Sequence, residues 1–508
     1  MVLSPREIED LTLELVGIQS VNGTPGEAAA VEFLAARLRE SPLARRGDLK
    51  VYLLSSPQDP LHRPVVVAHR PGRGRSGVLL MGHIDTVGVD DYLDLEDDAL
   101  RPHNLTERIA QGALGAEMAA LARSGDWLFG RGVLDMKSGV AAALAAFLSL
   151  AESAPDGHLL FAATPDEEGS SHGVRVLDAW LAEYLPAAGF TLGAVLNTDY
   201  TTSRPDDAGS FHAYAGSTGK LLPAVYVQGI PSHAAEPERG LDPSAALAAI
   251  TSEVAYSEVL RDAAEGDLAP PPVTLFQRDG KPFYDVQTAL YASAYYNLFH
   301  RQRTPGEQLE RFVQQARRGA QAFAERTVAL SLPPLRVISF ADLAQAAPQV
   351  IPPAVDGLDV REAARRIVAS LVAQTFPDEP VAVCYFAGPL IPSVESAPWA
   401  RLALESAVAA AGVPYRVHRY YPYISDLSFL AESRDWDDAA FVENYPLAAF
   451  GGAAGIPPRS QLAPLMLGPH GFGAHQRSER VLRPHAFEIL PRLLHSTAEE
   501  LLRAQPVG

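Results

Sequence analysis

At three places in this chain, a short apolar strand runs directly into residues that can bind a metal. The strands and the residues that follow them are 78–82 with His83 and Asp85, 159–163 with Glu167 and Glu168, and 194–196 with Asp199. In an open α/β sheet, ligands bind at the carboxyl ends of the strands. A single residue of this kind is more often a helix N-cap or a chance placement. Three such junctions at one sheet edge therefore indicate a shared binding site.

The sequence around these junctions predicts an α/β domain. Helical periodicity over Glu27–Arg39 and Met136–Glu152 alternates with short apolar strands, among them Val65–Ala68. Strands that alternate with helices form a mostly parallel sheet whose two faces are covered by helices. We therefore expect a three-layer domain.

The pattern changes near Gly216, where longer alternating strands replace the short buried ones. The expected strands are 222–228, 273–277 and 289–299, and the expected helices are 242–260 and 305–329. This β-α-β-β-α order is typical of a small, ferredoxin-like α+β module.

Helix–strand alternation returns after about Ile391, so the module is expected to be an insertion. A chain of 508 residues also exceeds what one hydrophobic core usually covers. We predict a domain in two parts, residues 1–215 and 391–508, with the α+β module inserted at 216–390.

Two further segments supply residues that can bind metals. Asp135 stands in the loop 130–139, where its carboxylate can offer two oxygens to two ions. An Asp just before a helix is also a common N-cap, and for this segment taken alone the N-cap is the better interpretation. His475 ends the segment 468–475, and neutral His is a common zinc ligand. A lone His is more often structural, and His470 is interpreted in that way.

Together and in this order, these motifs resemble the zinc-dependent metallopeptidase and deacylase family of aminoacylase, carboxypeptidase G, acetylornithine deacetylase and succinyl-diaminopimelate desuccinylase. The resemblance covers nearly the whole chain, including the inserted module. It implies two divalent metal ions, zinc by ligand type, with manganese or cobalt as substitutes. The implied ligands are His83, Asp135 and Asp199 for one ion, and His475, Asp135 and Glu168 for the other, with Asp135 bridging.

The resemblance also assigns roles to residues beside the ions. Glu167 is implied as the general base, and Asp85 as the residue that orients His83. Since Glu167 must stay free while its neighbour binds metal, we expect both to lie on a loop rather than in a strand. A cis peptide bond is implied between Asp135 and Met136.

His233, in the segment 229–235 of the inserted module, resembles the family's lid histidine. In the family, that residue reaches the active site of the partner subunit and stabilises the oxyanion. A homodimer formed through the lid module is therefore implied. A loop histidine without function is the alternative for His233, and a monomer is the alternative assembly because the lid is longer than usual.

Within the family, the chain is most similar to the arginine-utilisation branch, the RocB-type proteins. The similarity lies in the long spacing between His83 and Asp135 and in the segments 126–132 and 284–288. Exopeptidases of the family carry an arginine that holds the substrate carboxylate, whereas Tyr284–His300 contains none. The resemblance implies cleavage of an amide or peptide bond in a small acylated amino acid or peptide, with a free α-carboxylate left open.

Composition limits the other partners. The formal net charge of −19 argues against a nucleic-acid surface, which needs clustered Lys and Arg. The longest apolar run, Val140–Leu150, is too short to cross a bilayer. Cys384 is the only cysteine, and Met1–Ile18 has acidic residues where a signal peptide would be basic and then apolar. We expect a cytoplasmic protein without membrane or nucleic-acid partners.

Two other classes of function compete with a hydrolase. A binding or regulatory relative could keep the fold and lose turnover, but it would have no need of Glu167. A nucleotide-dependent oxidoreductase would explain the Gly-rich segment 72–77, but a strand rather than a helix follows it. The residues therefore favour a metal-dependent amidohydrolase.

Overall fold

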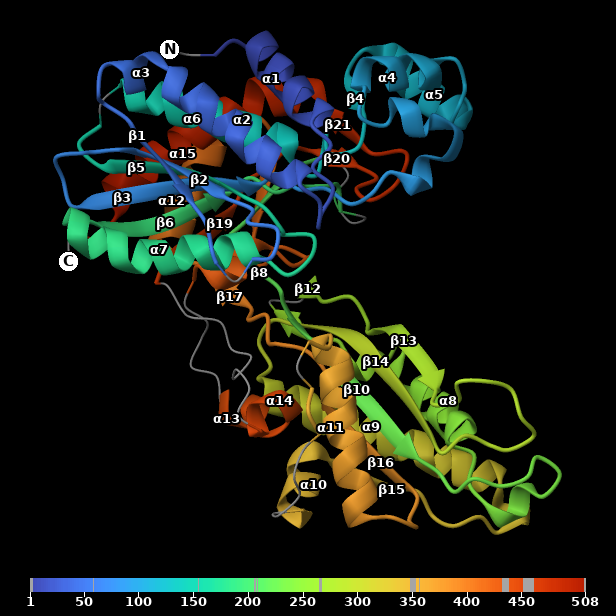
Figure 1. Ribbon diagram of the computed structural model, residues 1–508. Helices are drawn as coiled ribbons and strands as arrows, with labels where there is room; N and C mark the ends of the chain where they lie inside the picture. The colour runs from blue at the N-terminus through green and yellow to red at the C-terminus, as the bar shows by residue number, and fades with distance from the viewer. Residues whose placement is uncertain are drawn as a thin grey trace. The chain divides into compact units, whose positions relative to one another are not determined.

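The structure is a computed structural model that describes residues 3–506, apart from 58, 154, 205–206, 208, 265–266, 348–352, 356, 432–437 and 451–460. The chain divides into two units, called unit 1 and unit 2 below (Figure 1). Unit 1 comprises Met1–Ser217, Val394–Glu432 and Pro458–Gly508, and unit 2 comprises Thr218–Ser393 and Ser433–Pro457.

Unit 1 is built on a mixed sheet of eight strands. In spatial order they are β1 (Lys50–Leu54), β2 (Val65–Arg70), β5 (His158–Thr164), β3 (Ser76–His83), β6 (Thr191–Asn197), β19 (Ala463–Met466), β7 (Phe211–Tyr214) and β18 (Tyr415–His418). The central strands from β5 to β19 are parallel, whereas β2 is antiparallel to both of its neighbours. All residues of β5 are buried, which explains its continuous apolar sequence.

Helices cover both faces of this sheet and give three layers (Figure 1). The core on one face is formed with α1 (Pro5–Gly17), α2 (Gly26–Glu40), α6 (Lys137–Glu152), α12 (Pro398–Ala410) and α15 (Leu490–Ala504). The opposite face is covered by α7 (His172–Ala188). The predicted α/β architecture is confirmed.

Helix α6 brings the loop of Asp135 against the sheet. Its small-residue sequence is buried along nearly the whole length of the helix. A Cβ added at Gly139 would lie 2.1 Å from the backbone oxygen of Thr198, so only glycine permits this approach. The contact places the first turn of α6 beside Asp199.

Between β3 and α6, the chain forms a helical insertion with its own small core. It contains η1 (Asp90–Asp98), α4 (Pro102–Ala110) and α5 (Gly115–Ser124), and it accounts for the long spacing between His83 and Asp135. The next strand, β4 (Trp127–Phe129), pairs with β21 (Arg480–Leu482), which pairs with β20 (Gly471–Phe472). This small sheet brings the loop of His475 beside the loop of Asp135.

Unit 2 contains a ferredoxin-like arrangement. Its strands β10 (Pro223–Gln228), β13 (Val273–Asp279), β14 (Tyr291–His300) and β16 (Val381–Phe386) lie in the spatial order β13-β14-β10-β16, and each neighbouring pair is antiparallel. One face is covered by α8 (Pro243–Val254) and α9 (Pro305–Arg326). Strand and helix order agree with the pattern expected from the sequence.

The sheet of unit 2 is extended by β15 (Arg336–Ser339), which pairs parallel with β16. The helices α10 (Phe340–Ala346) and α11 (Val360–Thr375) cover its second face. Along β10, Val225 and Val227 face α8 and α9, whereas Ala224 and Tyr226 belong to the core with α11. The additional helices that cover the second face make this module longer than a two-layer one.

The boundaries of unit 2 differ from the predicted insertion at 216–390. Its long segment is Thr218–Ser393, and it also includes residues 433–457, which the sequence placed with residues 391–508. In this second segment, α13 (Asp438–Glu443) packs Phe441 against Phe386, with ring centroids 4.9 Å apart. The backbone oxygen of Asn444 accepts a hydrogen bond from Phe386 N at 2.9 Å. Tertiary packing, which local periodicity does not report, joins this segment to unit 2.

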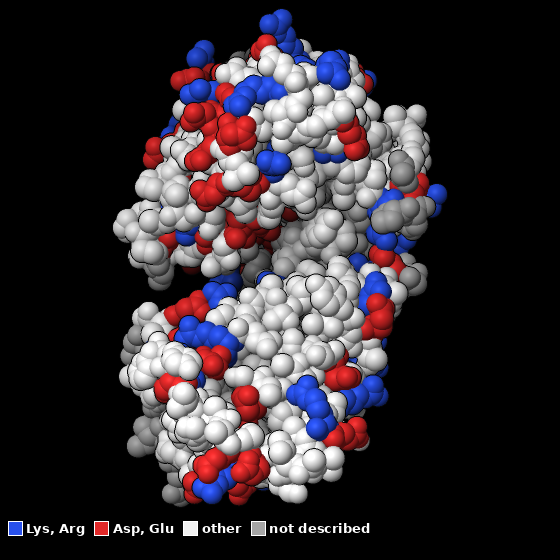
Figure 2. Space-filling view, turned by 90° about the vertical axis from the view of Figure 1, so that its right-hand side faces the viewer, with Lys and Arg blue, Asp and Glu red and all other residues white. Residues whose placement is uncertain are grey.

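The surface carries charges of both signs. On the face drawn in Figure 2, Asp and Glu side chains lie among Lys and Arg. This mixture follows from a composition of 42 Lys and Arg residues against 61 Asp and Glu residues. Within the described ranges, no helix combines the length and apolar character needed to cross a membrane.

Candidate metal centre

Three neighbouring parallel strands bring predicted site residues to one edge of the unit 1 sheet. The end of β3 at His83 is in register with Thr164 at the end of β5, and Asn197 at the end of β6 is in register with Met81, two residues earlier in β3. The chain leaves β5 in a turn that carries Glu167 and Glu168, and it reaches Asp199 just after β6. Because parallel strands end on the same side of a sheet, these side chains lie together.

Two groups of possible metal ligands converge at this edge. The inner group is His83, Asp135 and Asp199, and the outer group is Asp135, Glu168 and His475. Within each group, the ligand atoms lie within 4.8 Å of one another. All five residues implied as ligands therefore come together, and all belong to unit 1.

Asp135 presents one oxygen to each group. Its Oδ1 lies 3.2 Å from His83 Nε2, and its Oδ2 lies 3.2 Å from His475 Nε2. His475 Nε2 is also 2.9 Å from Glu168 Oε1. The carboxylate of Asp135 is thus placed to bridge two ions.

The spacing and type of these atoms fit zinc-like ions. Zinc binds His nitrogen and carboxylate oxygen at about 2.0–2.2 Å, so tetrahedral ligand atoms lie roughly 3.4 Å apart. The His–carboxylate distances of 2.9 and 3.2 Å are close to this value. In addition, Asp85, Asp135 and Asp199 are each no more than 6% exposed. Several buried carboxylates in one place must be paired with cations or take up protons.

Sequence comparison agrees with this geometry. Residues 79–500, a range that contains both ligand groups, match Peptidase family M20/M25/M40. The chain belongs to this family. It is therefore a metal-dependent hydrolase, and the predicted family resemblance is confirmed.

The relatives of this M20 chain match over different lengths. Protein RocB from Bacillus subtilis (strain 168) is 29% identical over 99% of this chain and 96% of its own. Succinyl-diaminopimelate desuccinylase from Dinoroseobacter shibae is 29% identical over 49% of this chain and 56% of its own. The crystal structure of aminopeptidase PepT from Bacillus cereus ATCC 10987 has a TM-score of 0.56 at 12% identity, covering 99% of this chain and 100% of that one. That structure shows the shared fold.

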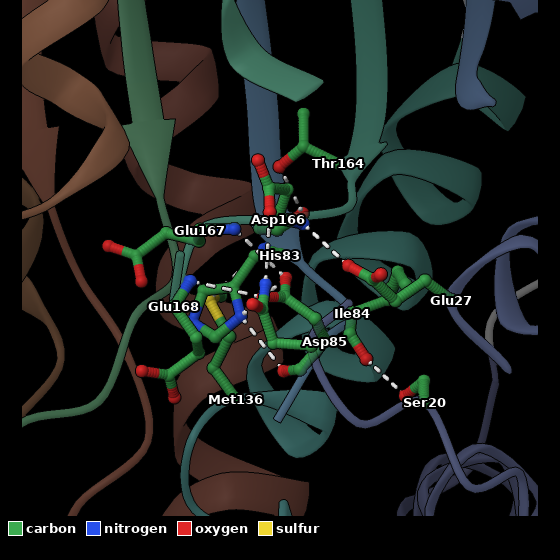
Figure 3. Close-up of polar contacts among 12 residues, drawn as sticks. Ser20, Glu27, His83, Ile84, Asp85, Met136, Thr164, Asp166, Glu167 and Glu168 are labelled. Carbon is green, nitrogen blue, oxygen red and sulfur yellow. Dashed lines mark hydrogen bonds and ion pairs between the residues drawn. The ribbon is translucent and has the colours of Figure 1, made fainter. Parts of the chain in front are cut away.

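In this M20 protein, Asp85 holds the turn that carries Glu167 and Glu168 (Figure 3). The Asp85 carboxylate accepts hydrogen bonds from Glu167 N at 3.1 Å and from Glu168 N at 3.0 Å. Asn22, which was not predicted from the sequence, donates to the same carboxylate at 3.0 Å. Asp85 Oδ1 also lies 3.5 Å from His83 Nδ1, whose nearer contact, at 3.1 Å, is the backbone oxygen of Asp85. Asp85 therefore contacts both the histidine that it was expected to orient and the acidic turn.

Burial and neighbouring charges shift the ionisation of the metal-free site. Burial raises the pKa of Glu167 well above its ordinary value, and the nearby Asp426 carboxylate raises it further. Burial also opposes ionisation of Asp135, but hydrogen bonds from His475 and from the inner-group histidine lower its pKa. Hydrogen bonds to Asp135 and Glu168 raise the pKa of His475 to about 10. Protons therefore provide the positive charge that metal ions would replace.

Asp426 belongs to the acidic surroundings of the site and was not predicted from the sequence. It begins η5 (Asp426–Phe429), is 1% exposed and accepts a hydrogen bond from Thr164 Oγ1 at 3.1 Å. Burial raises the pKa of Asp426 to about 6. Because 262 residues separate Asp426 from Thr164, no local pattern marks it as a neighbour of the site.

Lys137 anchors the chain just after Asp135. The Lys137 ammonium is fully buried and donates to the backbone oxygens of Leu15 at 2.9 Å and Ile18 at 2.8 Å. These oxygens lie at the C-terminal end of α1, where carbonyl groups lack helical partners. Burial lowers the pKa of Lys137 to about 7. The intervening Asp135–Met136 peptide bond is cis, as the family resemblance implies.

His233 lies in unit 2, outside the unit that holds the other predicted site residues. It is exposed, and its Nδ1 accepts a hydrogen bond from Ala235 N at 3.1 Å. A short bridge pairs His233 with Gln287, in the loop before β14. Its role in the site stays a prediction.

Proposed function

We propose that this protein hydrolyses an amide or peptide bond in a small acylated amino acid or short peptide, using two divalent ions of the zinc type. The observation that carries the proposal is the pair of ligand groups that share Asp135. Beside them stands Glu167, a carboxylate that belongs to neither group. Two ions and a free carboxylate are the components that metal-assisted amide hydrolysis requires.

The inner and outer groups would each hold one ion. His nitrogen and carboxylate oxygen favour zinc, and manganese or cobalt would also be accepted by these ligands. When bound, the two ions would polarise the scissile carbonyl and lower the pKa of the attacking water.

Glu167 acts as the general base in this proposal. It takes the proton of the attacking water and later donates it to the leaving nitrogen. Its backbone amide is fixed by Asp85 at 3.1 Å, and the same carboxylate fixes the amide of Glu168 at 3.0 Å. In the close-up, both glutamate side chains project away from Asp85 (Figure 3). Asp85 thus sets the spacing between the base and the neighbouring ligand.

The substrate class follows from the family and from one sequence feature. Tyr284–His300 includes β14 and contains no arginine to bind a free carboxylate. We therefore propose an acylated amino acid or short peptide that is not held by a lid arginine in this segment. The resemblance to the arginine-utilisation branch supports a role in amino-acid breakdown, arginine utilisation included, and the similarity to RocB extends over 99% of the chain. The single cysteine, Cys384, supports a cytoplasmic location.

Unit 2 supports a homodimer in which each copy completes the other's site. Its strand β13 is at the end of its sheet, and Leu275 within it is 50% exposed. The following loop exposes Phe283 and Tyr284, at 71% and 88%. An unpaired strand edge with apolar residues is a surface that associates readily. In the proposed dimer, His233 would donate a hydrogen bond to the oxyanion in the partner's site.

Metal analysis combined with a screen of acylated amino acids and dipeptides tests the proposed reaction. We expect two ions per chain and turnover of at least one substrate class. Glu167→Gln should lower kcat by about 10²- to 10⁴-fold with both ions retained, because the substitution keeps shape and removes the proton acceptor. Glu168→Gln is the matched control and should also lower metal occupancy. Two bound ions without turnover across the screen would favour a binding protein, and full activity of Glu167→Gln would exclude it as the base.

Mixing two inactive variants tests the dimer. His233→Ala should lower kcat by about 10²- to 10³-fold if it removes one oxyanion donor. A mixed dimer of His233→Ala and Glu167→Gln has one site with an intact base and an intact partner histidine. Activity should therefore return in part after subunit exchange. No recovery despite proven exchange would show that His233 acts within its own chain or has no catalytic role.

A further inference from the structure

We propose that Glu479 is a positioning residue that fixes the metal-binding loop of Asp135 and couples it to the loop of His475. The inference rests on the proposed two-metal function, and it assigns a role to a residue that belongs to neither ligand group. Glu479 is completely buried, although it lies only four residues after His475.

The Glu479 carboxylate binds the backbone of the Asp135 loop directly. Its Oε1 accepts hydrogen bonds from Gly132 N at 2.8 Å, Leu134 N at 3.1 Å and Asp135 N at 3.2 Å. These residues precede α6 and lie in a turn, so helix hydrogen bonds do not hold them. One oxygen atom therefore sets the path of the chain up to the bridging ligand.

Arg131 compensates the buried charge of Glu479. Its Nη1 donates to Glu479 Oε2 at 2.7 Å, and its Nη2 donates to Asp91 Oδ1 at 2.7 Å. The side chains of Arg131 and Glu479 are 1% and 0% exposed. Because Arg131 occupies Oε2, Oε1 is left to the three amides. Asp91 extends this network into the helical insertion.

The backbone of Glu479 is also hydrogen-bonded to both the loop of Asp135 and the loop of His475. Its oxygen accepts a hydrogen bond from Gly130 N at 3.1 Å, and its amide donates to Gln476 O at 2.9 Å. Directly after it, Arg480 pairs with Phe129 in the small sheet of β21 and β4. His475 itself has a φ of 61°, a conformation that side chains disfavour. The loop of the outer-group histidine thus depends on contacts at its C-terminal end, which Glu479 supplies.

A displaced Asp135 loop would lower the affinity of the site for metal ions. Asp135 must direct Oδ1 and Oδ2 to two different ions, so a small rotation of its loop would misplace both. The three amides that share Glu479 Oε1 resist such a rotation, because each broken hydrogen bond would leave a buried polar group without a partner. Residues that orient metal ligands in this way typically contribute about 10- to 100-fold to metal affinity or activity.

The test compares Glu479→Gln with wild type and with Leu150→Ala, a matched stability control. Leu150 is fully buried in α6, about 20 Å along the helix from Lys137, so its truncation should destabilise unit 1 without moving the loop. Zinc affinity is measured by chelator competition on metal-depleted protein, together with thermal unfolding and the visible spectrum after cobalt loading. We expect Glu479→Gln to bind zinc about 10- to 100-fold more weakly and to change the cobalt spectrum. Leu150→Ala should lower Tm alone.

Amide hydrogen exchange in the metal-free protein gives a second readout. Exchange at Gly132, Leu134 and Asp135 should accelerate in Glu479→Gln but not in Leu150→Ala. If Glu479→Gln does not fold, Glu479→Asp carries the test, since it keeps the charge beside Arg131 but is too short to reach the amides.

The outcomes separate this inference from the proposed function. Wild-type zinc affinity and cobalt spectrum in a Glu479 variant with lowered Tm would show a merely structural role and overturn the inference. Wild-type protein that binds no divalent ion would instead contradict the proposed two-metal function itself.

Discussion

The inner and outer ligand groups differ in burial and in support, although they share Asp135. His83 and Asp199 of the inner group are 2% and 4% exposed, whereas the His475 side chain of the outer group is 50% exposed. The inner histidine and Asp199 come from β3 and from just after β6, which are hydrogen-bonded neighbours. Glu168 and His475 come from a turn and a loop. An inner ion would be enclosed by protein, and an outer ion would have a route to solvent.

The two ligand groups therefore depend on different parts of the fold. Sheet hydrogen bonds position His83 and Asp199, the two ligands that belong to the inner group alone. Two buried carboxylates position the outer ones: Asp85 holds the turn of Glu168, and Glu479 lies at the end of the His475 loop. We therefore expect the outer ion to exchange faster and to respond more strongly to changes in the surrounding residues.

The largest effect is expected from Asp135→Ala, which removes the residue common to both groups. Without this carboxylate, each group keeps only two of its three ligands, and both ions should be lost along with turnover. Metal analysis after gel filtration measures the loss. One tightly retained ion would show that Asp135 does not bridge and that the two groups are independent.

A smaller and selective effect is expected from removing one group at a time. His475→Ala should release only the outer ion, and Asp199→Ala only the inner one. Because protonated His475 contacts the buried carboxylates of Asp135 and Glu168 in the metal-free protein, its truncation should also lower the unfolding free energy of that form. Metal content and calorimetry check both points. Loss of two ions from His475→Ala would contradict the separation of the groups.

The order in which the two ions are released gives a kinetic test of the difference between the groups. A chelating dye should remove zinc from wild-type protein in two phases, with the exposed outer ion leaving first. Stopped-flow absorbance resolves the phases, and His475→Ala is the control that should lack the faster one. A single phase in wild type would mean that exposure of the ligand does not govern release.

The smallest effect is a pH dependence of metal affinity. The pKa of His475 is raised to about 10 by hydrogen bonds to Asp135 and Glu168, so at neutral pH the metal-free histidine carries a proton. A metal requires neutral His, and binding must release that proton. Affinity of the outer group should therefore rise with pH, by about tenfold per unit for one proton, and level off near pH 10. Titrations at several pH values measure the slope, and a flat profile would contradict the raised pKa.

Much of the site could be predicted because its signals are local. A short apolar strand followed by His83 or Asp199 is visible within ten residues, and rules for parallel sheets predict where such strand ends lie. The acidic pair of Glu167 and Glu168 was expected on a loop, and the structure has it in the turn after β5. The α+β pattern from Gly216 onward also followed from strand and helix periodicity.

The remaining features depend on contacts between distant parts of the chain. Glu479 reaches the amide of Asp135 across 344 residues, and Asp426 meets Thr164 across 262 residues. Residues 438–450, the described part of the second segment of unit 2, pack on the rest of that unit through Phe441 and Phe386. Periodicity and spacing report only on neighbours along the chain. They are enough to find residues that can bind metal at the ends of strands. Tertiary structure decided which buried carboxylates hold those residues in place, because that choice depends on which loops the packed sheets bring together.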